Sequence, residues 1–183
     1  ESFEGLNVTV IRQPNTGRFL ARRTGIQQAS GTHVLFLDTR VFVHPTSLRF
    51  VMPYLSENAT SLWTADVHAN TNGNPIARFW RCIESVFWRR YMRRPNTTSF
   101  GLDDFDYYPK GTTALIGPRD LLLEAIQSFQ PTVTDWRKVN DDTALLRYAV
   151  ERQRINISPG YSCTSLSWDL SGYRFCYSSA PRP

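Results

Sequence analysis

Two groups of charged residues stand where the sequence predicts the ends of regular elements. Asp38 follows the apolar run 34–37, and Arg40 comes two residues later. Asp141 and Asp142 stand directly before a stretch with the apolar spacing of a helix. A carboxylate at a helix N-terminus stays ionised, because the free backbone N–H groups and the helix dipole favour the anion. Such a group can accept a proton as a general base, and an arginine can neutralise an anionic ligand.

The elements that must position these residues alternate between strands and helices. Strands are predicted at 7–11, 34–37, 61–69 and 112–116. Helices are predicted at 18–29, 46–55, 76–94 and 141–153, with another beginning at 117–118 and a loop at 95–110. The unit 7–37 reads as strand, helix, strand. This alternation predicts an α/β fold, a three-layer α/β/α sandwich around a mostly parallel (mixed) sheet. In such sheets ligands bind beyond the carboxyl ends of strands, where Asp38 is expected.

Composition limits the function without choosing it. A chain of 183 residues, 41% hydrophobic and 20% charged, predicts a single globular domain spanning 1–183. No apolar stretch reaches the roughly 18 residues that cross a bilayer, and the three cysteines form no CxxC pair. The formal net charge of +5 suits an anionic partner, whether nucleic acid, nucleotide diphosphate or membrane surface.

Two long segments carry a resemblance to a known family. The first is "NTGRFLARRTGIQQASGTHVLFLDTR", with Asn15, Gly17, Gly25, Gly31 and Asp38 at fitting intervals. The second is "GTTALIGPRDLLLEAIQSF", followed later by "NDDTALLRYAVERQRINISPG". Together they resemble the inverting glycosyltransferases of family 2, over about residues 7 to 160. The resemblance implies a Rossmann-like, A-type nucleotide-diphospho-sugar transferase fold, with a donor half at about 1–70 and an acceptor half at about 71–183.

The resemblance also implies an activity and partners. The chain would move a sugar from a nucleotide-diphosphate donor to an acceptor hydroxyl with inversion. The acceptor would be a carbohydrate or lipid-linked, in cell-surface polysaccharide or glycolipid synthesis, with segments 101–110 and 111–116 contributing to its binding. The implied location is cytoplasmic, at the inner face of the membrane and in contact with its surface; no nucleic acid is expected. A non-catalytic member that serves as a binding or assembly module is the alternative.

The resemblance assigns roles to individual residues. Asp142, or its neighbour Asp141, would be the base; the alternative is that both merely complement the helix dipole. Asp38 would contact the nucleotide, and Arg22 would reach it from the helix after the Asn-Gly turn, unless it lies on a solvated basic face. Arg174, within "SGYRF", matches the arginine of the Gln-x-x-Arg-Trp motif of processive members and would contact the diphosphate.

The chain departs from the family pattern at two places. The Asp-x-Asp motif reads Asp38-Thr39-Arg40, and arginine repels a cation. Either Arg40 supplies the counter-charge of the diphosphate, or Mg²⁺ or Mn²⁺ is held by Asp38 with another carboxylate, or Asp38 and Arg40 form a structural pair. The family's N-terminal nucleotide-binding strand is also missing, so the chain is expected to be a piece of a longer one.

The segment 76–94, "IARFWRCIESVFWRRYMRR", combines aromatic residues at helical spacing with arginines. The favoured interpretation is a core helix with arginine side chains reaching the rim. The alternative is a helix lying on an anionic membrane surface, near lipid-linked acceptors.

Overall fold

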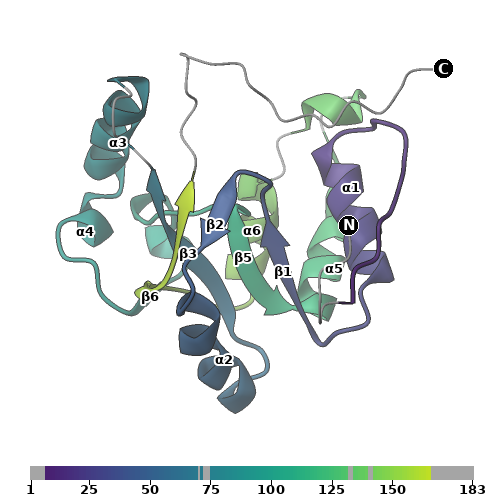
Figure 1. The fold of residues 1–183 in the computed structure, drawn as a ribbon, viewed down its shortest axis with the longest axis horizontal. Helices are drawn as coiled ribbons and strands as arrows, with labels where there is room; N and C mark the ends of the chain where they lie inside the picture. Colours follow the sequence, from purple (N-terminus) through teal and green to yellow (C-terminus); the bar gives the residue numbers. More distant parts are fainter. Residues whose placement is uncertain (1–6, 70, 72–74, 132–133, 140–141, 166–183) are drawn as a thin grey trace.

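The computed structural model describes residues 7–69, 71, 75–131, 134–139 and 142–165. A six-stranded mixed sheet lies at the centre, in the order β1-β5-β3-β6-β2, with β4 paired to β6 off this path (Figure 1). The strands are β1 His33–Leu37, β2 Val41–Val43, β3 Leu62–Ala69, β4 Thr98–Phe100, β5 Ala114–Pro118 and β6 Ile155–Ser165. The α-helices are α1 Arg18–Gln28, α2 Ser47–Glu57, α3 Pro75–Phe87, α4 Arg89–Met92, α5 Arg119–Ser128 and α6 Asp142–Val150. Two 3-10 helices, η1 Leu102–Tyr107 and η2 Trp136–Lys138, complete the set.

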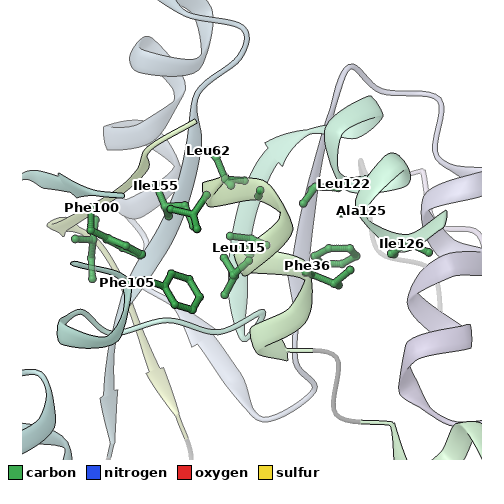
Figure 2. Packing of buried hydrophobic residues seen from close by; sticks show 14 of the residues in the cluster. Phe36, Leu62, Phe100, Phe105, Leu115, Leu122, Ala125, Ile126 and Ile155 are labelled. Carbon is green, nitrogen blue, oxygen red and sulfur yellow. The ribbon is translucent and has the colours of Figure 1, made fainter. Parts of the chain in front are cut away.

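Helices cover both faces of this sheet, which confirms the predicted α/β fold. Alternate residues of the central strands enter two separate cores, because successive side chains of a strand point to opposite faces. Leu62 packs in the core shared with α1, α5 and α6, whereas Trp63 packs in the core under α2. Figure 2 shows the first core, with Phe36, Leu62 and Leu115 from the strands and Leu122 and Ile126 from α5. Each fully buried aliphatic side chain stabilises the fold by roughly 1.5–3 kcal/mol.

The strand directions differ from the prediction of a mostly parallel sheet. Among the described strands only the pair β3–β6 is parallel, and the other four pairs are antiparallel. The prediction of a strand at 7–11, which would have completed a parallel unit, is wrong: residues 7–17 have no regular secondary structure and Val8 and Val10 are exposed. In the described part of the chain β1 pairs with β5 alone, so it is an edge strand.

The central strand β6 was not predicted, because "INISPGYSCTS" contains the turn-like Pro159-Gly160. The register explains how the strand accommodates them. Ala65 of β3 faces Ser158, and the next residue of β3 faces Ser162, so residues 159–161 form a bulge in β6. The predicted loop 95–110 likewise contains the short strand β4 and the helix η1.

The predicted single helix at 76–94 is broken at Trp88 into α3 and α4. The break turns α4 so that Tyr91 enters the core, where its side chain is fully buried. The favoured interpretation of the aromatic residues as core is wrong, because the stripe on α3 is largely exposed: Phe79 60%, Trp80 57%, Val86 66% and Phe87 67%. Figure 1 shows α3 standing at one end of the sheet. None of the described helices has both the length and the apolar character to cross a membrane.

Candidate functional site

Three strands bring their carboxyl ends to one edge of the sheet. β1 and β3 both run antiparallel to β5, and β6 runs parallel to β3, so β1, β3 and β6 point the same way. Asp38 follows the last residue of β1, Asp66 lies in the second half of β3, and Cys163 lies near the end of β6. This edge is where open α/β sheets bind ligands.

Asp38 is held at this edge by its backbone and its side chain. Its N–H donates to the carbonyl oxygen of Thr113 at 3.0 Å, and its own carbonyl accepts from the N–H of Val41 at 3.1 Å. Its carboxylate oxygen Oδ1 accepts a hydrogen bond from Arg22 Nη2, also at 3.0 Å. The Arg22 side chain is 12% exposed and that of Asp38 is 39% exposed. Asp38 and Arg22 were both predicted to contact a nucleotide, and the structure places them together. The Asp38 carboxylate remains partly open to solvent.

The start of α1 fixes the direction from which Arg22 approaches. Gly17 precedes the helix with φ of 96°, a left-handed conformation that side chains other than glycine rarely adopt. A Cβ at this position would lie 2.7 Å from the carbonyl oxygen of Trp136, so the backbone of η2 packs directly against the turn. Phe19 buries one side of α1 in the core, and the Arg22 guanidinium lies 5.8 Å from the Phe36 ring centre.

The described residues do not fit a divalent cation at Asp38. One carboxylate oxygen already accepts from a guanidinium, and the position two residues later is the exposed Arg40 rather than an acid. In the part of the chain that the structure describes, no three His, Cys, Asp or Glu side chains come together as a metal site. Asp38 instead has the guanidinium of Arg22 as its partner, and Arg40 follows two residues later; positive charges near the site suit an anionic ligand.

A buried carboxylate, Asp66, was missed by the sequence analysis. Its side chain is 2% exposed, and its Oδ2 accepts a hydrogen bond from the Tyr91 hydroxyl at 3.0 Å. His68 Nε2 lies 3.5 Å from the same oxygen, whereas Oδ1 has no hydrogen-bond partner among the described residues. Burial, and then the charge and hydrogen bond of Asp66, raise the pKa of Tyr91. An acid inside the apolar strand "LWTADVHA" was the signal that could have revealed it.

Cys163 links Asp66 to Asp38. Burial, and then the negative charges of Asp66 and Asp38, together raise the pKa of the Cys163 thiol to about 11. Both carboxylates are thus near enough to act on the same thiol. The thiol itself is fully buried and stays protonated at neutral pH, so it is an inert part of the packing.

A pocket lies beside the sheet edge that carries Asp38; its volume is about 480 Å³, including the part that is open to solvent. It is lined by residues of β3, of the α3–α4 segment and of the stretch that leads into β5: Thr64, Ala65, Val67, Glu84, Trp88, Met92, Pro109, Lys110, Gly111 and Thr113. Thr113 also holds the Asp38 backbone, so the pocket adjoins the Asp38 site. Lys110 Nζ is fixed by the carbonyl oxygen of Phe105 at 2.7 Å. The segments 101–110 and 111–116, predicted for acceptor binding, thus contribute to a pocket.

The predicted base is described only by its backbone. α6 begins at Asp142, and residues 151–154 join its end to Ile155, which pairs with Leu62 at the start of β3. The nine residues of α6 span about 13 Å, and the ribbon runs from the Asp38 edge toward this opposite edge (Figure 1). The start of α6 is therefore on the side of the sheet edge that carries Asp38. Asp141 and Arg174 lie outside the described residues.

Comparison with protein-family models gives a match over the first part of the chain. The family model described as glycosyl transferase family 2 matches residues 1–112, which is more than half of the chain. The matched part contains Arg22, Asp38, Asp66 and most of the pocket lining, and it ends before α6. No curated protein matches the chain.

Proposed function

Because the chain belongs to glycosyl transferase family 2, we propose that it transfers a sugar from a nucleotide-diphosphate donor to an acceptor hydroxyl, with inversion at the anomeric carbon. The observation that carries the proposal is the Arg22–Asp38 pair at the carboxyl end of β1, beside a pocket. A carboxylate that is partly exposed and is held in place by a nearly buried guanidinium is a preorganised polar group rather than an incidental surface ion pair.

The donor binds at Asp38 in this proposal. Asp38 Oδ1 is oriented by Arg22, which leaves the other oxygen to accept from a hydroxyl of the nucleotide ribose. The guanidinium of Arg40, on the same turn, balances the charge of the leaving diphosphate through charge-assisted hydrogen bonds. Arg174 is a second proposed diphosphate contact. No step is routed through a metal ion, because the residues described around Asp38 do not fit one.

Asp142 acts as the base in this proposal, with Asp141 as the alternative. The acceptor oxygen attacks the anomeric carbon from the face opposite the diphosphate, and Asp142 takes the hydroxyl proton. The bond from the anomeric carbon to the diphosphate oxygen breaks, and its electron pair leaves with the nucleotide diphosphate. The transition state has oxocarbenium character, as in other glycosyl chemistry. A place at the N-terminus of α6 keeps the carboxylate ionised and ready to accept.

The acceptor occupies the pocket that adjoins Thr113. Its lining combines the aromatic Trp88 with polar groups such as Glu84 and Thr113, a mixture that suits a sugar, whose apolar ring face stacks while its hydroxyls bond. We propose a carbohydrate or lipid-linked acceptor, as in polysaccharide or glycolipid synthesis at the cytoplasmic face of a membrane.

A non-catalytic binding or assembly module is the second candidate. The observation that favours it is Arg40, which stands where the Asp-x-Asp motif has its second acid. Such a module would retain the fold and the pocket without transferring sugar.

The test compares Asp142→Asn with Asp120→Asn in a preparation that transfers sugar. Asp120 is the matched control, because it is also a carboxylate in the first turn of a helix, α5. Asp142→Asn is expected to lower turnover by at least about 100-fold while donor affinity stays near that of the unchanged protein. Asp120→Asn is expected to have no effect on either quantity. Unchanged turnover in Asp142→Asn would remove the base assignment.

A further inference from the structure

Helix α3 presents an apolar stripe to solvent. The stripe consists of Ile76, Phe79, Trp80, Ile83, Val86 and Phe87. At 3.6 residues per turn these six positions fall within an arc of about 120°. Four of the six are more than half exposed, and the only buried residue of α3 is Ala77, which lies outside the arc. An apolar face of this width normally packs on a core, but here it points away from the molecule.

The side of α3 that faces the protein is narrow and largely polar. Ala77 is buried there, and Glu84 lines the pocket beside Trp88. Burial raises the pKa of the Glu84 carboxyl, although the neighbouring Arg81, 3.7 Å away, acts in the opposite sense. The helix is therefore oriented with its polar side inward, which leaves the apolar stripe for a separate partner.

The charge of the whole chain is concentrated at the same place. Residues 75–94 contain six arginines and one glutamate, a formal charge of +5, which equals that of the whole chain. The remaining 15 basic and 15 acidic residues therefore balance. The arginines are Arg78, Arg81, Arg89, Arg90, Arg93 and Arg94. Arg89 and Arg93 line a hollow between α3 and α4, together with the apolar side chains of Val86 and Met92.

We propose that α3 and the arginines of residues 75–94 bind an anionic membrane surface. The apolar stripe would enter the boundary between headgroups and acyl chains, and the arginines would contact lipid phosphates. Phenylalanine and tryptophan in such a stripe, beside arginines, are typical of helices that lie in this boundary. A second copy of the chain fits less well, because two surfaces of charge +5 repel each other. This inference concerns binding to lipid and does not depend on sugar transfer.

The position of α3 gives the inference a consequence for the site. α3 follows β3, and β1 and β3 run in the same direction, so α3 stands at the sheet edge that carries Asp38 (Figure 1). A membrane bound to α3 would lie beside the pocket, which Glu84 of α3 helps to line. If the proposed function holds, this placement suits an acceptor that is linked to lipid.

The test measures sedimentation of the whole chain with vesicles of phosphatidylcholine, with or without phosphatidylserine, in the absence of nucleotide sugar. Binding is expected only with phosphatidylserine and is expected to weaken as salt rises. Replacing Arg89, Arg93 and Arg94 by Gln should lower the affinity about fivefold per arginine, on the order of 100-fold in total. The control replaces three exposed arginines elsewhere, Arg12, Arg49 and Arg147, and should leave at least most of the affinity.

The apolar stripe is tested separately. Phe79→Ala with Phe87→Ala should reduce binding to the same vesicles, whereas Phe42→Ala, an equally exposed phenylalanine on β2, should not. Lipids brominated in the acyl chain should quench Trp80 fluorescence, and Trp80→Phe should remove that quenching. Circular dichroism confirms that each variant is folded.

Three results would overturn the proposal. The first is a wild-type chain that does not bind phosphatidylserine vesicles. The second is an equal loss of binding in the control arginine set. The third is a chain that does not bind the vesicles but forms a concentration-dependent dimer, which the double variant Phe79→Ala with Phe87→Ala dissociates. This result would assign the stripe to a second copy of the chain.

Discussion

The ion pair between Arg22 and Asp38 should stabilise the folded chain measurably, and a double-mutant cycle tests this. The single variants are Arg22→Met, which keeps the apolar stem over Phe36, and Asp38→Ala; the third protein carries both changes. The coupling free energy is the loss in the double variant subtracted from the sum of the two single losses. Effects that the two side chains do not share cancel in this difference.

The magnitude follows from distance and exposure. Two unit charges about 4 Å apart attract by about 4 kcal/mol at an effective dielectric constant of 20. Desolvation and side-chain ordering offset most of this, and fully exposed pairs retain only about 0.2–1 kcal/mol. Arg22 is 12% exposed but Asp38 is 39% exposed, so solvent screens one partner and not the other. We expect a coupling of about 1–1.5 kcal/mol, between the values for exposed pairs and for charged hydrogen bonds.

The assay is urea unfolding followed by circular dichroism, at low salt and again at high salt. The matched control is the pair Arg119–Asp120, whose N–O distance is 3.4 Å and whose carboxylate is 93% exposed; its coupling should be near zero. High salt should reduce the Arg22–Asp38 coupling only partly, because one partner is nearly buried. A coupling as small as that of the control pair would show that Asp38 is not held in place by Arg22, and would remove the support for a prepared donor contact.

Three further predictions concern the parts that surround this pair. Gly17→Ala should lower the free energy of unfolding by more than about 2 kcal/mol, because Gly17 has a positive φ and the added Cβ would lie 2.7 Å from backbone atoms. Gly25→Ala, with open space around the added Cβ, should raise the free energy of unfolding by up to about 1 kcal/mol. Urea unfolding measures both changes. Tyr91→Phe should cost about 1–3 kcal/mol by leaving a buried carboxylate without its donor. Because the pKa of Tyr91 is raised on folding, its contribution is complete below pH ~10 and falls as pH rises above it, so the alkaline loss of stability should be shallower in Tyr91→Phe. Iodoacetamide at pH 8 should label exposed Cys82 quickly and buried Cys163 only after unfolding. Mass spectrometry of the modified peptides measures the two labelling rates, and equal rates would contradict the prediction.

Local patterns predicted the helices and the main strands, because capping residues, glycines and apolar spacing determine where an element begins and ends from residues that are close together in the sequence. α1, α2 and β3 lie within two residues of their predicted bounds. The strand predicted at 7–11 shows the limit of such patterns. Its alternating sequence suits a strand, but a strand needs a neighbour to pair with, and no local pattern reports whether one is present.

Burial was the property that the sequence predicted least well. The spacing along α3 identified correctly which side chains share a face, but the same spacing describes a helix that buries that face and one that exposes it. In β6 the pair Pro159-Gly160 was typical of a turn, and only the bulge opposite Ala65 allows the strand to continue. Asp66 was overlooked because its partner Tyr91 is 25 residues away in the sequence.

Titration calorimetry with a panel of nucleotide-diphosphate sugars tests the central claim most directly, since the proposed chemistry begins with donor binding at Asp38. The account predicts that at least one donor binds, that Asp38→Asn weakens this binding by about tenfold or more, and that Asp120→Asn binds as the unchanged chain does. Equal affinity in the Asp38→Asn and Asp120→Asn variants, or no heat from any donor, would contradict it.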